Sequence, residues 1–374
     1  MAQSPPDVVE KNVKAKRFKC DGCGAEMKYN ASVKKLKCDF CGAVKDVPAG
    51  EGAVVERDLF EGFATAPRGL GAATAVKTSR CQECGANVAF PDGATSTKCT
   101  FCGSARVLEQ AENSNALRPE SLLPFHIDKK QANASFSSWI TKLWFRPSDL
   151  KAMAKVQEVA GVYVPFWTFD AHVDSQWTAE AGYHYYEEEE YTTQENGETV
   201  TRSRSVQRTR WESAWGSRSD DYDDVLVCAS KGLPRELADG MKTFDTTQLV
   251  PYSPGFLAGW RAEEYAVDLQ EGFGMGQQKM IAEQERRCAK DVPGDTHRAL
   301  SVDNTFSALT FKHVLLPVWI AAYRYNNKVY RFLVNGQTGE VVGKAPWSVF
   351  KILLAVLAIA ALIAVLVILG RHHK

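Results

Sequence analysis

The chain has 374 residues, of which 45% are hydrophobic and 24% are charged. This is the composition of an ordinary globular protein, and it excludes wholesale disorder. The 45 Lys and Arg residues balance the 45 Asp and Glu residues, so no net charge attracts the whole molecule to nucleic acid or to an anionic surface. Any such attraction must be local.

Eight of the 10 cysteines form four Cys-x-x-Cys pairs within the first 102 residues. A Cys-x-x-Cys turn directs two thiolates to one point, and a short hairpin brings a second turn opposite the first, which closes a tetrahedral four-sulfur site. The spacing predicts two zinc ribbons with one zinc ion each, rather than a disulfide framework. The predicted ligands are Cys20, Cys23, Cys38 and Cys41 in the first ribbon and Cys81, Cys84, Cys99 and Cys102 in the second.

The two ribbons are an internal duplication, because every cysteine of the second follows its equivalent by 61 residues. Glycines 24, 42, 85 and 103 follow the second cysteine of each pair, where a side chain would crowd the turn. A segment of about 25 residues is too short to bury a core, so bound metal must supply the stability, roughly 10 to 16 kcal/mol. Iron in a rubredoxin-like site is the alternative metal, and thioredoxin-like redox chemistry is a weaker alternative.

The first ribbon is cationic, and Lys34, Lys35 and Lys37 precede its second cysteine pair. Such a surface can bind the phosphates of nucleic acid by counterion release, or anionic lipid headgroups at a membrane. A solvated cationic face without a ligand is the third interpretation. No run of aromatic residues alternates with these lysines to stack on bases. The linker that follows contains Leu59, Phe60 and Phe63, which predict a short docking helix.

We call the part of the chain between the second ribbon and the apolar C-terminal run the body. The sequence of its first part predicts a helix at residues 130–145, a strand at 162–173 and a long hairpin. The hairpin arms are residues 177–191 and 199–211, and Asn196-Gly197 favours a type I′ turn between them. Residue numbers of facing positions then sum to 393, which places Glu189 opposite Arg204 and Tyr185 opposite Arg208. The acidic run 187–190 is predicted to pair with the arginines, and a cation site there is the alternative.

The second part of the body predicts a helix from Ser253-Pro254 to about Lys290, weakened in its middle by glycines 272, 274 and 276. Strands follow at residues 309–325 and 328–334, and a short strand at 340–342. Around the turn at Asn326-Asn327 the facing positions sum to 653, so Tyr323 faces Tyr330.

The order of features in the body repeats. Residues 122–125 (LLPF), a helix and residues 162–167 (VYVPFW) parallel residues 249–252 (LVPY), a helix and residues 314–319 (VLLPVW). The repetition predicts two related units, each a helix with an antiparallel sheet, in which Trp167 is equivalent to Trp319.

The apolar run at residues 352–369 is long enough to cross a membrane. Its 18 residues would cover roughly 27 Å of hydrocarbon as a helix. Trp347 and Lys351 before the run, and Arg371 and Lys374 after it, suit the two interfaces. The N-terminus lacks the apolar core of a secretory signal, and the cysteines are spaced for metal rather than disulfides. We therefore expect a tail-anchored, single-pass protein whose N-terminal domains face the cytosol.

We expect no enzymatic activity, because the sequence contains no recognisable set of nucleophile, base and orienting group, and no open metal site. Asp295 and His297 are the best isolated catalytic candidates, but a capping Asp and a surface His explain them. Cys228 and Cys288 are single thiols that are typical of core or surface positions in a reduced compartment.

The double ribbon and several later motifs resemble a family of bacterial membrane-anchored double zinc-ribbon proteins. Its members are often labelled primosomal protein N′ (replication factor Y)-like superfamily II helicases or TFIIB-type zinc-ribbon-containing proteins. The resemblance covers about residues 20–347, and its motifs are RPESLLPF at 118–125, GVYVPFWTFDA at 161–171, PGDTH at 293–297 and YRFLVNGQTGEVVGKAPW at 330–347. It implies the bacterial cytoplasmic (inner) membrane as the location. Helicase activity is rejected, because the sequence has neither a phosphate loop ending in Gly-Lys-Ser/Thr nor an acidic magnesium-binding box.

The sequence therefore predicts an α+β protein that acts as a non-enzymatic, membrane-tethered scaffold or adaptor in the cytosol, recruiting protein partners for envelope maintenance. The alternative is a membrane-attached nucleic-acid-binding protein that uses the basic first ribbon. The predicted regions are a basic lead-in (1–17), zinc ribbon 1 (18–46), a linker (47–78), zinc ribbon 2 (79–110), α+β unit 1 with the long hairpin (111–245), α+β unit 2 (246–346), a transmembrane helix (347–370) and a short tail (371–374).

Overall fold

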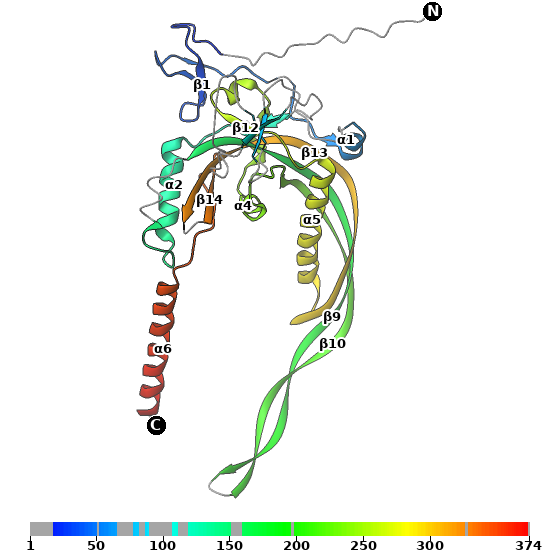
Figure 1. Ribbon diagram of the computed structural model, residues 1–374. Helices are drawn as coiled ribbons and strands as arrows, with labels where there is room; N and C mark the ends of the chain where they lie inside the picture. Colours follow the sequence, from blue (N-terminus) through cyan, green and yellow to red (C-terminus); the bar gives the residue numbers. More distant parts are fainter. Residues whose placement is uncertain are drawn as a thin grey trace, which may run out of the picture.

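A computed structural model describes residues 18–50, 52–65, 78–81, 87–89, 107–110, 119–150, 159–195, 198–325 and 328–372. The described chain is a mixed α+β arch, as the sequence predicts (Figure 1). A long curved sheet forms the top and one limb of the arch, and helices α2 and α6 form the other limb. The small three-stranded sheet of the first cysteine-rich segment lies on the top, away from α6.

The helices and strands alternate irregularly along the chain. Their bounds are β1 Met27–Asn30, β2 Lys35–Cys38, β3 Val44–Lys45, β4 Arg57–Asp58, α1 Leu59–Thr65, β5 Thr78–Cys81, β6 Asn87–Ala89, β7 Val107–Gln110, β8 Ser121–Leu122, α2 Lys129–Lys142, β9 Ala160–Glu195, β10 Glu198–Cys228, α4 Arg235–Gly240, β11 Val250–Pro251, β12 Arg261–Glu263, α5 Leu269–Asp291, β13 Thr296–Tyr325, β14 Lys328–Asn335, β15 Val341–Gly343 and α6 Val349–His372; 3₁₀ helices η1 and η2 cover Thr246–Gln248 and Pro254–Leu257.

Three long strands dominate the sheet. Strand β9 pairs antiparallel with β10 on one side and with β13 on the other. The predicted register of the hairpin is confirmed, because Glu189 pairs with Arg204 and Tyr185 with Arg208. The β13–β14 register is confirmed as well, since Tyr323 pairs with Tyr330. Strands β9, β10 and β13 extend much further than the sequence predicts. The hairpin pairing of β9 and β10 continues to Phe166 and Cys228, and β13 pairs with β9 from Thr296 to Ile320.

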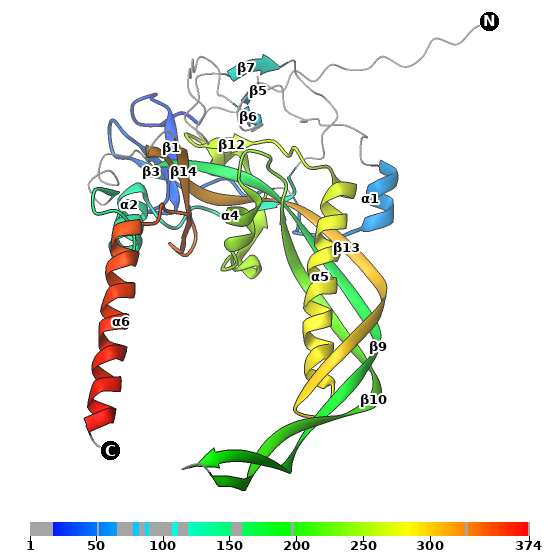
Figure 2. The ribbon, with the colours of Figure 1, turned by 60° about the horizontal axis from the view of Figure 1, so that its bottom comes forward.

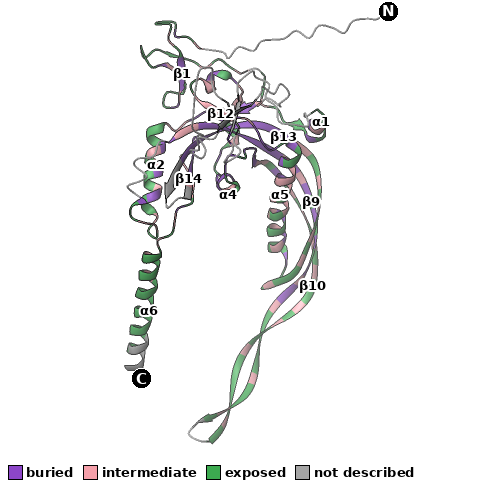
Figure 3. Cartoon of the chain, in the orientation of Figure 1, coloured by how far each residue is buried: buried purple, intermediate pink, exposed green. Residues whose placement is uncertain are grey.

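The distal part of the β9–β10 hairpin projects beyond α5, and we call residues 183–195 and 198–210 the arm (Figure 2). Side chains in the arm are exposed or half-buried, whereas the proximal parts of β9 and β13 are buried (Figure 3). The predicted pairing of acidic and basic residues is present, with 2.7 Å between Arg204 and Glu189 and between Arg208 and Glu187.

Helix α5 begins at Leu269, so the prediction of a helix from Ser253 is wrong. Ser253 does cap a helix, but only the 3₁₀ turn η2, and strand β12 intervenes before Asp268 caps α5. Helix α5 continues through all three glycines, and Gly272 lies against the ring of Trp167, where the lack of a side chain allows the helix to approach the sheet.

The expected docking helix in the linker is confirmed as α1. Its first residue, Leu59, is fully buried, and Gly62 lies against the ring of Phe311 in β13. Strand β4, immediately before α1, pairs with β13.

Both halves of the body contribute to one sheet instead of forming two. Strands β9 and β13 pair directly, with Trp319 beside Gly161. Strand β8 lies parallel to β13, where Leu122 is beside Leu315, and β12 lies parallel to β9, where Ala262 is beside Tyr163. Strand β8 thus precedes α2 and pairs with β13, which follows α5. In the same way β12 precedes α5 and pairs with β9, which follows α2.

The two tryptophans of the repeated motif make the same kind of hydrogen bond. The indole Nε1 of Trp319 donates to the carbonyl oxygen of Ile127 at 3.0 Å, and that of Trp167 donates to the carbonyl oxygen of Val267 at 2.9 Å. Both acceptors lie immediately before the aspartate that caps the following helix.

A second pair of backbone contacts has the same arrangement. The Gly336 carbonyl accepts hydrogen bonds from the N–H groups of two consecutive residues, and the Ala229 carbonyl does the same. The donors are His126 and Ile127 for Gly336, at 2.9 and 2.8 Å, and Ala266 and Val267 for Ala229, at 2.7 and 3.0 Å. The structural counterpart of Leu122 is therefore Ala262. Residues 249–252, which the sequence matches to residues 122–125, do not occupy that place, since Val250 lies in β11, which pairs antiparallel with β8 at Leu122.

Helix α6 is long and apolar enough to cross a membrane, and none of its span Val349–Leu366 is buried in the protein. Its side chains are exposed along nearly its whole described length (Figure 3). Both views show α6 and the arm projecting from the same side of the arch (Figures 1 and 2).

Candidate metal centre

The four cysteines of the first ribbon converge on one point. The sulfur atoms of Cys20 and Cys41 are 3.4 Å apart, and those of Cys23 and Cys38 are 3.5 Å apart. All four sulfur atoms lie within 4.8 Å of one another. A zinc ion bound tetrahedrally at about 2.3 Å requires sulfur atoms about 3.8 Å apart, so the geometry fits a four-thiolate metal site.

Two matching backbone turns position these thiols. The Gly24 N–H donates to the Cys20 carbonyl at 2.8 Å, and the Gly42 N–H donates to the Cys38 carbonyl at 3.1 Å. Both glycines have a positive φ, 73° and 76°, which a residue with a Cβ adopts only at a cost. This is the physical reason for glycine directly after each second cysteine.

The turns also prepare two of the sulfur atoms to be thiolates. Backbone N–H groups of Cys41 and Phe40 point at the Cys38 sulfur and lower the pKa of that thiol to about 6. The N–H groups of Gly22 and Cys23 lower the pKa of Cys20 in the same way. Thiolate is the form that binds metal. Four cysteine ligands leave no coordination position for a substrate, so an ion held here would supply folding stability rather than catalysis.

The ribbon packs onto the body, so metal is not its sole support. Cys20, Cys38 and Leu36 belong to the same buried cluster as Phe125 and Trp319. The Tyr29 N–H donates to the Ala258 carbonyl at 2.9 Å, and the Trp260 indole donates to the Tyr29 carbonyl at 2.9 Å. Docking on the body therefore stabilises this segment in addition to any bound metal, which the sequence alone does not predict.

The three lysines predicted to form a basic surface on the ribbon have different surroundings. Lys35 contacts Asp46 at 2.8 Å, and Lys34 occupies the turn between β1 and β2 with φ 55°. Lys37 lines a half-open cavity of about 530 Å³ between the ribbon and the body. Sequence reasoning missed the other cavity residues, because they come from separate elements: they include Lys28, Lys129, Trp260 and Arg261.

Most of the predicted second ribbon lies outside the described residues, including Cys84, Cys99 and Cys102. Cys81 is described and is buried at the end of β5. Arg80 in β5 pairs with Asn87 in β6. In the first ribbon Lys19 pairs with Glu26, and each of these residues lies 61 positions before its equivalent in the second ribbon. This part of the second segment follows the backbone pattern of the first.

The isolated catalytic candidates have structural roles. The Asp295 carboxylate accepts a hydrogen bond from the His184 N–H at 2.7 Å, and the Asp295 N–H donates to the Gly182 carbonyl at 2.8 Å. These bonds fix the start of β13 to the root of the arm. Cys228 and Cys288 are buried, and burial raises the pKa of the Cys228 thiol to about 12, so both are core residues.

Three carboxylates converge at a second place in the described part of the chain. The carboxylates of Glu56, Asp170 and Asp223 lie within 4.8 Å of one another. Sequence reasoning could not find them, since the three residues are far apart in the chain.

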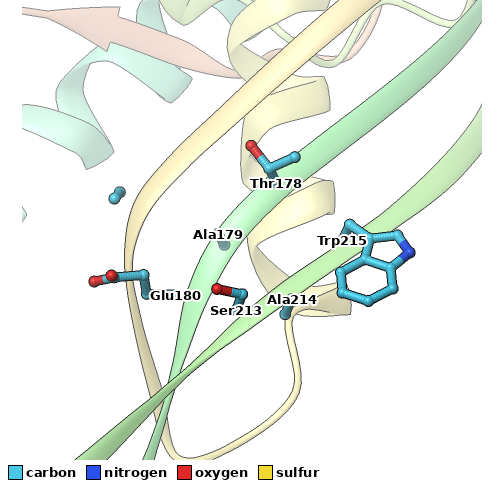
Figure 4. A pocket seen from close by; sticks show the side chains of 7 residues that line it. Thr178, Ala179, Glu180, Ser213, Ala214 and Trp215 are labelled. Carbon is cyan, nitrogen blue, oxygen red and sulfur yellow. The ribbon is translucent and has the colours of Figure 1, made fainter.

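A shallow hollow of about 450 Å³ lies on the sheet between Thr178, Glu180, Ser213 and Trp215 (Figure 4). Its lining groups do not form a nucleophile, a base and an orienting group, within the part of the chain that is described.

No family model matches the chain, and no solved structure matches it. A curated protein does: the uncharacterized protein YdjG of Bacillus subtilis (strain 168) is 30% identical over 247 residues, which cover 64% of this chain and 67% of that protein. This chain, with the cysteine cluster and the apolar helix described above, therefore belongs to the same family as YdjG.

Proposed function

We propose that this protein is a non-enzymatic scaffold, tethered by α6 to the bacterial cytoplasmic membrane, that recruits protein partners in the cytosol for envelope maintenance. The observation that carries the proposal is the arm. A two-stranded hairpin that extends past its supporting helix contributes little to the core and presents exposed side chains on both faces. An exposed tyrosine, such as Tyr186, supplies contact area typical of protein interfaces.

The metal centre supports the scaffold by holding the top of the arch in one shape. We propose that zinc occupies the four-cysteine site and that a second zinc ion is bound by Cys81, Cys84, Cys99 and Cys102. We also propose that the body consists of two related units, which the matching contacts of Trp167 and Trp319 support. The resemblance to the double zinc-ribbon family is part of the same proposal, and it carries no helicase activity.

The topology that we propose rests on α6 and on the cysteines. Helix α6 is the one described helix that is apolar and long enough to cross a membrane. We propose that the body stays in the cytosol, where unpaired cysteine thiols remain reduced and available for zinc.

Proximity labelling from the native locus tests the scaffold. The wild type is compared with a variant in which residues 184–209 are replaced by a two-residue Asn-Gly turn. Proteins labelled by the wild type and lost in the armless variant support the proposal, provided that both variants are equally abundant in the membrane fraction. An identical labelled set in both variants, or ATP consumption by the purified wild type, contradicts it.

The second candidate function is nucleic-acid binding, and the cavity beside Lys37 is the observation that favours it. Because the ribbon packs onto the body, the full chain is tested. A triple Lys→Glu variant at positions 34, 35 and 37 should reduce the salt dependence of binding by a slope of about 2 to 3 if these lysines contact phosphates. Binding that is absent in the wild type, or unchanged in the variant, removes this candidate.

A further inference from the structure

The segment that follows α2 exposes large aromatic side chains beside the start of α6. Trp144 is 78% exposed, and Trp347 and Phe350 are 64% and 69% exposed. We call residues 143–147 the α2 loop. Large aromatic residues that are exposed together usually mark a surface that contacts something else.

Four contacts fix the α2 loop at the level of the first turn of α6. The Ser348 N–H donates to the Phe145 carbonyl at 2.8 Å, and the Lys351 ammonium donates to the Arg146 carbonyl at 2.8 Å. The Arg146 guanidinium donates to the Ala345 carbonyl at 2.5 Å and lies 3.7 Å from the centre of the Trp347 ring. The loop and the beginning of α6 therefore form one local unit.

The charge of this unit has one sign. Lys142, Arg146 and Lys351 lie in or next to it, and no acidic residue occurs in residues 142–147 or 344–353. Cationic side chains attract anionic lipid headgroups, and tryptophan favours the boundary between headgroups and hydrocarbon because its ring is apolar and its N–H is polar.

We propose that the α2 loop enters the headgroup region of the same bilayer that α6 spans, with Trp144 at the boundary of the hydrocarbon. The membrane would then contact the protein at a second point besides α6. This point lies at Arg146, which is 199 residues before Ala345 in the chain. The inference rests on the proposed membrane insertion of α6. Its partner is the lipid interface, since aromatic and basic side chains coincide at the level where α6 would enter hydrocarbon.

Fluorescence quenching by brominated lipids tests the loop. The full chain is placed in nanodiscs that contain phosphatidylglycerol and lipids brominated near the carboxyl end of the acyl chain. Trp144→Phe should lower the quenched part of the tryptophan emission. The matched control is Trp215→Phe, because Trp215 is 77% exposed but belongs to β10, in the limb of the arch opposite α6. Its removal should raise the quenched fraction, since it deletes an unquenched fluorophore.

Two results have distinct meanings. If the protein does not float with lipid vesicles, α6 is not inserted and the proposed tether fails. If the protein floats but Trp144→Phe changes the quenched fraction in the same direction as Trp215→Phe, the loop is not at the interface and this inference alone is wrong. A protein partner at the loop would give that second outcome.

Discussion

Two glycines in one helix should respond oppositely to the same substitution. A Cβ at Gly272 would lie 2.6 Å from Cδ1 of the buried Trp167 ring, whereas a Cβ at Gly274 meets nothing within 4 Å. Gly272→Ala should therefore lower the free energy of unfolding by about 1 to 3 kcal/mol. Gly274→Ala should raise it by up to about 1 kcal/mol, because alanine favours the helix.

Chemical denaturation of the two variants in detergent measures this difference. Equal effects would show that α5 does not approach the sheet as closely as its glycines allow. A stabilising Gly272→Ala would have the same meaning.

Loss of one thiol should release the metal from the first ribbon. Cys38→Ser removes the ligand whose pKa is lowered by the N–H groups of Cys41 and Phe40, and three sulfur ligands bind zinc much more weakly than four. We expect the bound zinc of the purified protein to fall by one ion and amide exchange in residues 18–46 to accelerate. The control is Cys288→Ala, a buried thiol in α5, which should leave the zinc content unchanged. Unchanged zinc in Cys38→Ser would contradict the site.

Glu264 should make stability depend on pH near neutrality. Burial raises the pKa of its carboxyl to about 7, above the ordinary value of 4.5. The folded state then holds a proton that the unfolded state has lost, so stability should fall as pH rises from 4.5 to 7, by at most about 1.4 kcal/mol per pH unit. Unfolding measured across this window should show a smaller slope in Glu264→Gln than in the wild type. Parallel curves would show that Glu264 is ionised in the folded protein.

At the scale of elements, the arm should be dispensable for folding. Beyond α5 its strands pack mainly on each other, and its ion pairs are exposed to solvent, which screens them, so they contribute little to stability. We expect the Asn-Gly replacement of residues 184–209 to leave the melting temperature of the body nearly unchanged. A fall of more than a few degrees would show that the arm stabilises the core, and loss of partners in that variant would then have two explanations.

Local patterns predict local elements well in this chain. The position of Asn196-Gly197 in the sequence predicts the register of the hairpin, and the apolar run predicts α6, because both depend on neighbouring residues. The predicted start of α5 is wrong, since Ser253 caps a 3₁₀ turn as readily as a helix, and the competing strand β12 forms by pairing with β9 and β6, which are distant in the sequence.

The metal site was equally accessible to sequence reasoning, but its surroundings were not. The Cys-x-x-Cys spacing and the following glycines identify all four cysteines that converge in the first ribbon. Nothing in the spacing shows that Tyr29 and Trp260 attach the ribbon to the body, because they are 231 residues apart. The residues of the α2 loop were missed for the same reason.

At the scale of the whole molecule, the arm and α6 point in the same direction, and a membrane cannot accommodate both. The arm carries Glu187, Glu189, Arg204 and Arg208, and burying charges in hydrocarbon costs about 2.5 to 3.5 kcal/mol each. We therefore expect α6 and the α2 loop to reorient together relative to the arm when α6 inserts, while the arm stays in water (Figure 2).

Hydrogen exchange measures the position of the arm. Amides of the arm should exchange at the same rate in nanodiscs as in a variant that ends before Val349. Strong protection of the arm only in nanodiscs would show that it contacts lipid.

The pairing of β9 with β13 has a consequence for how the protein is made. Ala160 lies beside Ile320, so the central sheet joins residues separated by 160 positions. Contacts between such distant positions form slowly, because a long loop must close before they are gained. During synthesis β9 must wait for β13, and only a short stretch separates β13 from α6. If α6 inserts into a membrane as we propose, its insertion competes in time with closure of the sheet, and the newly made chain exposes an unpaired strand edge that chaperones would have to shield.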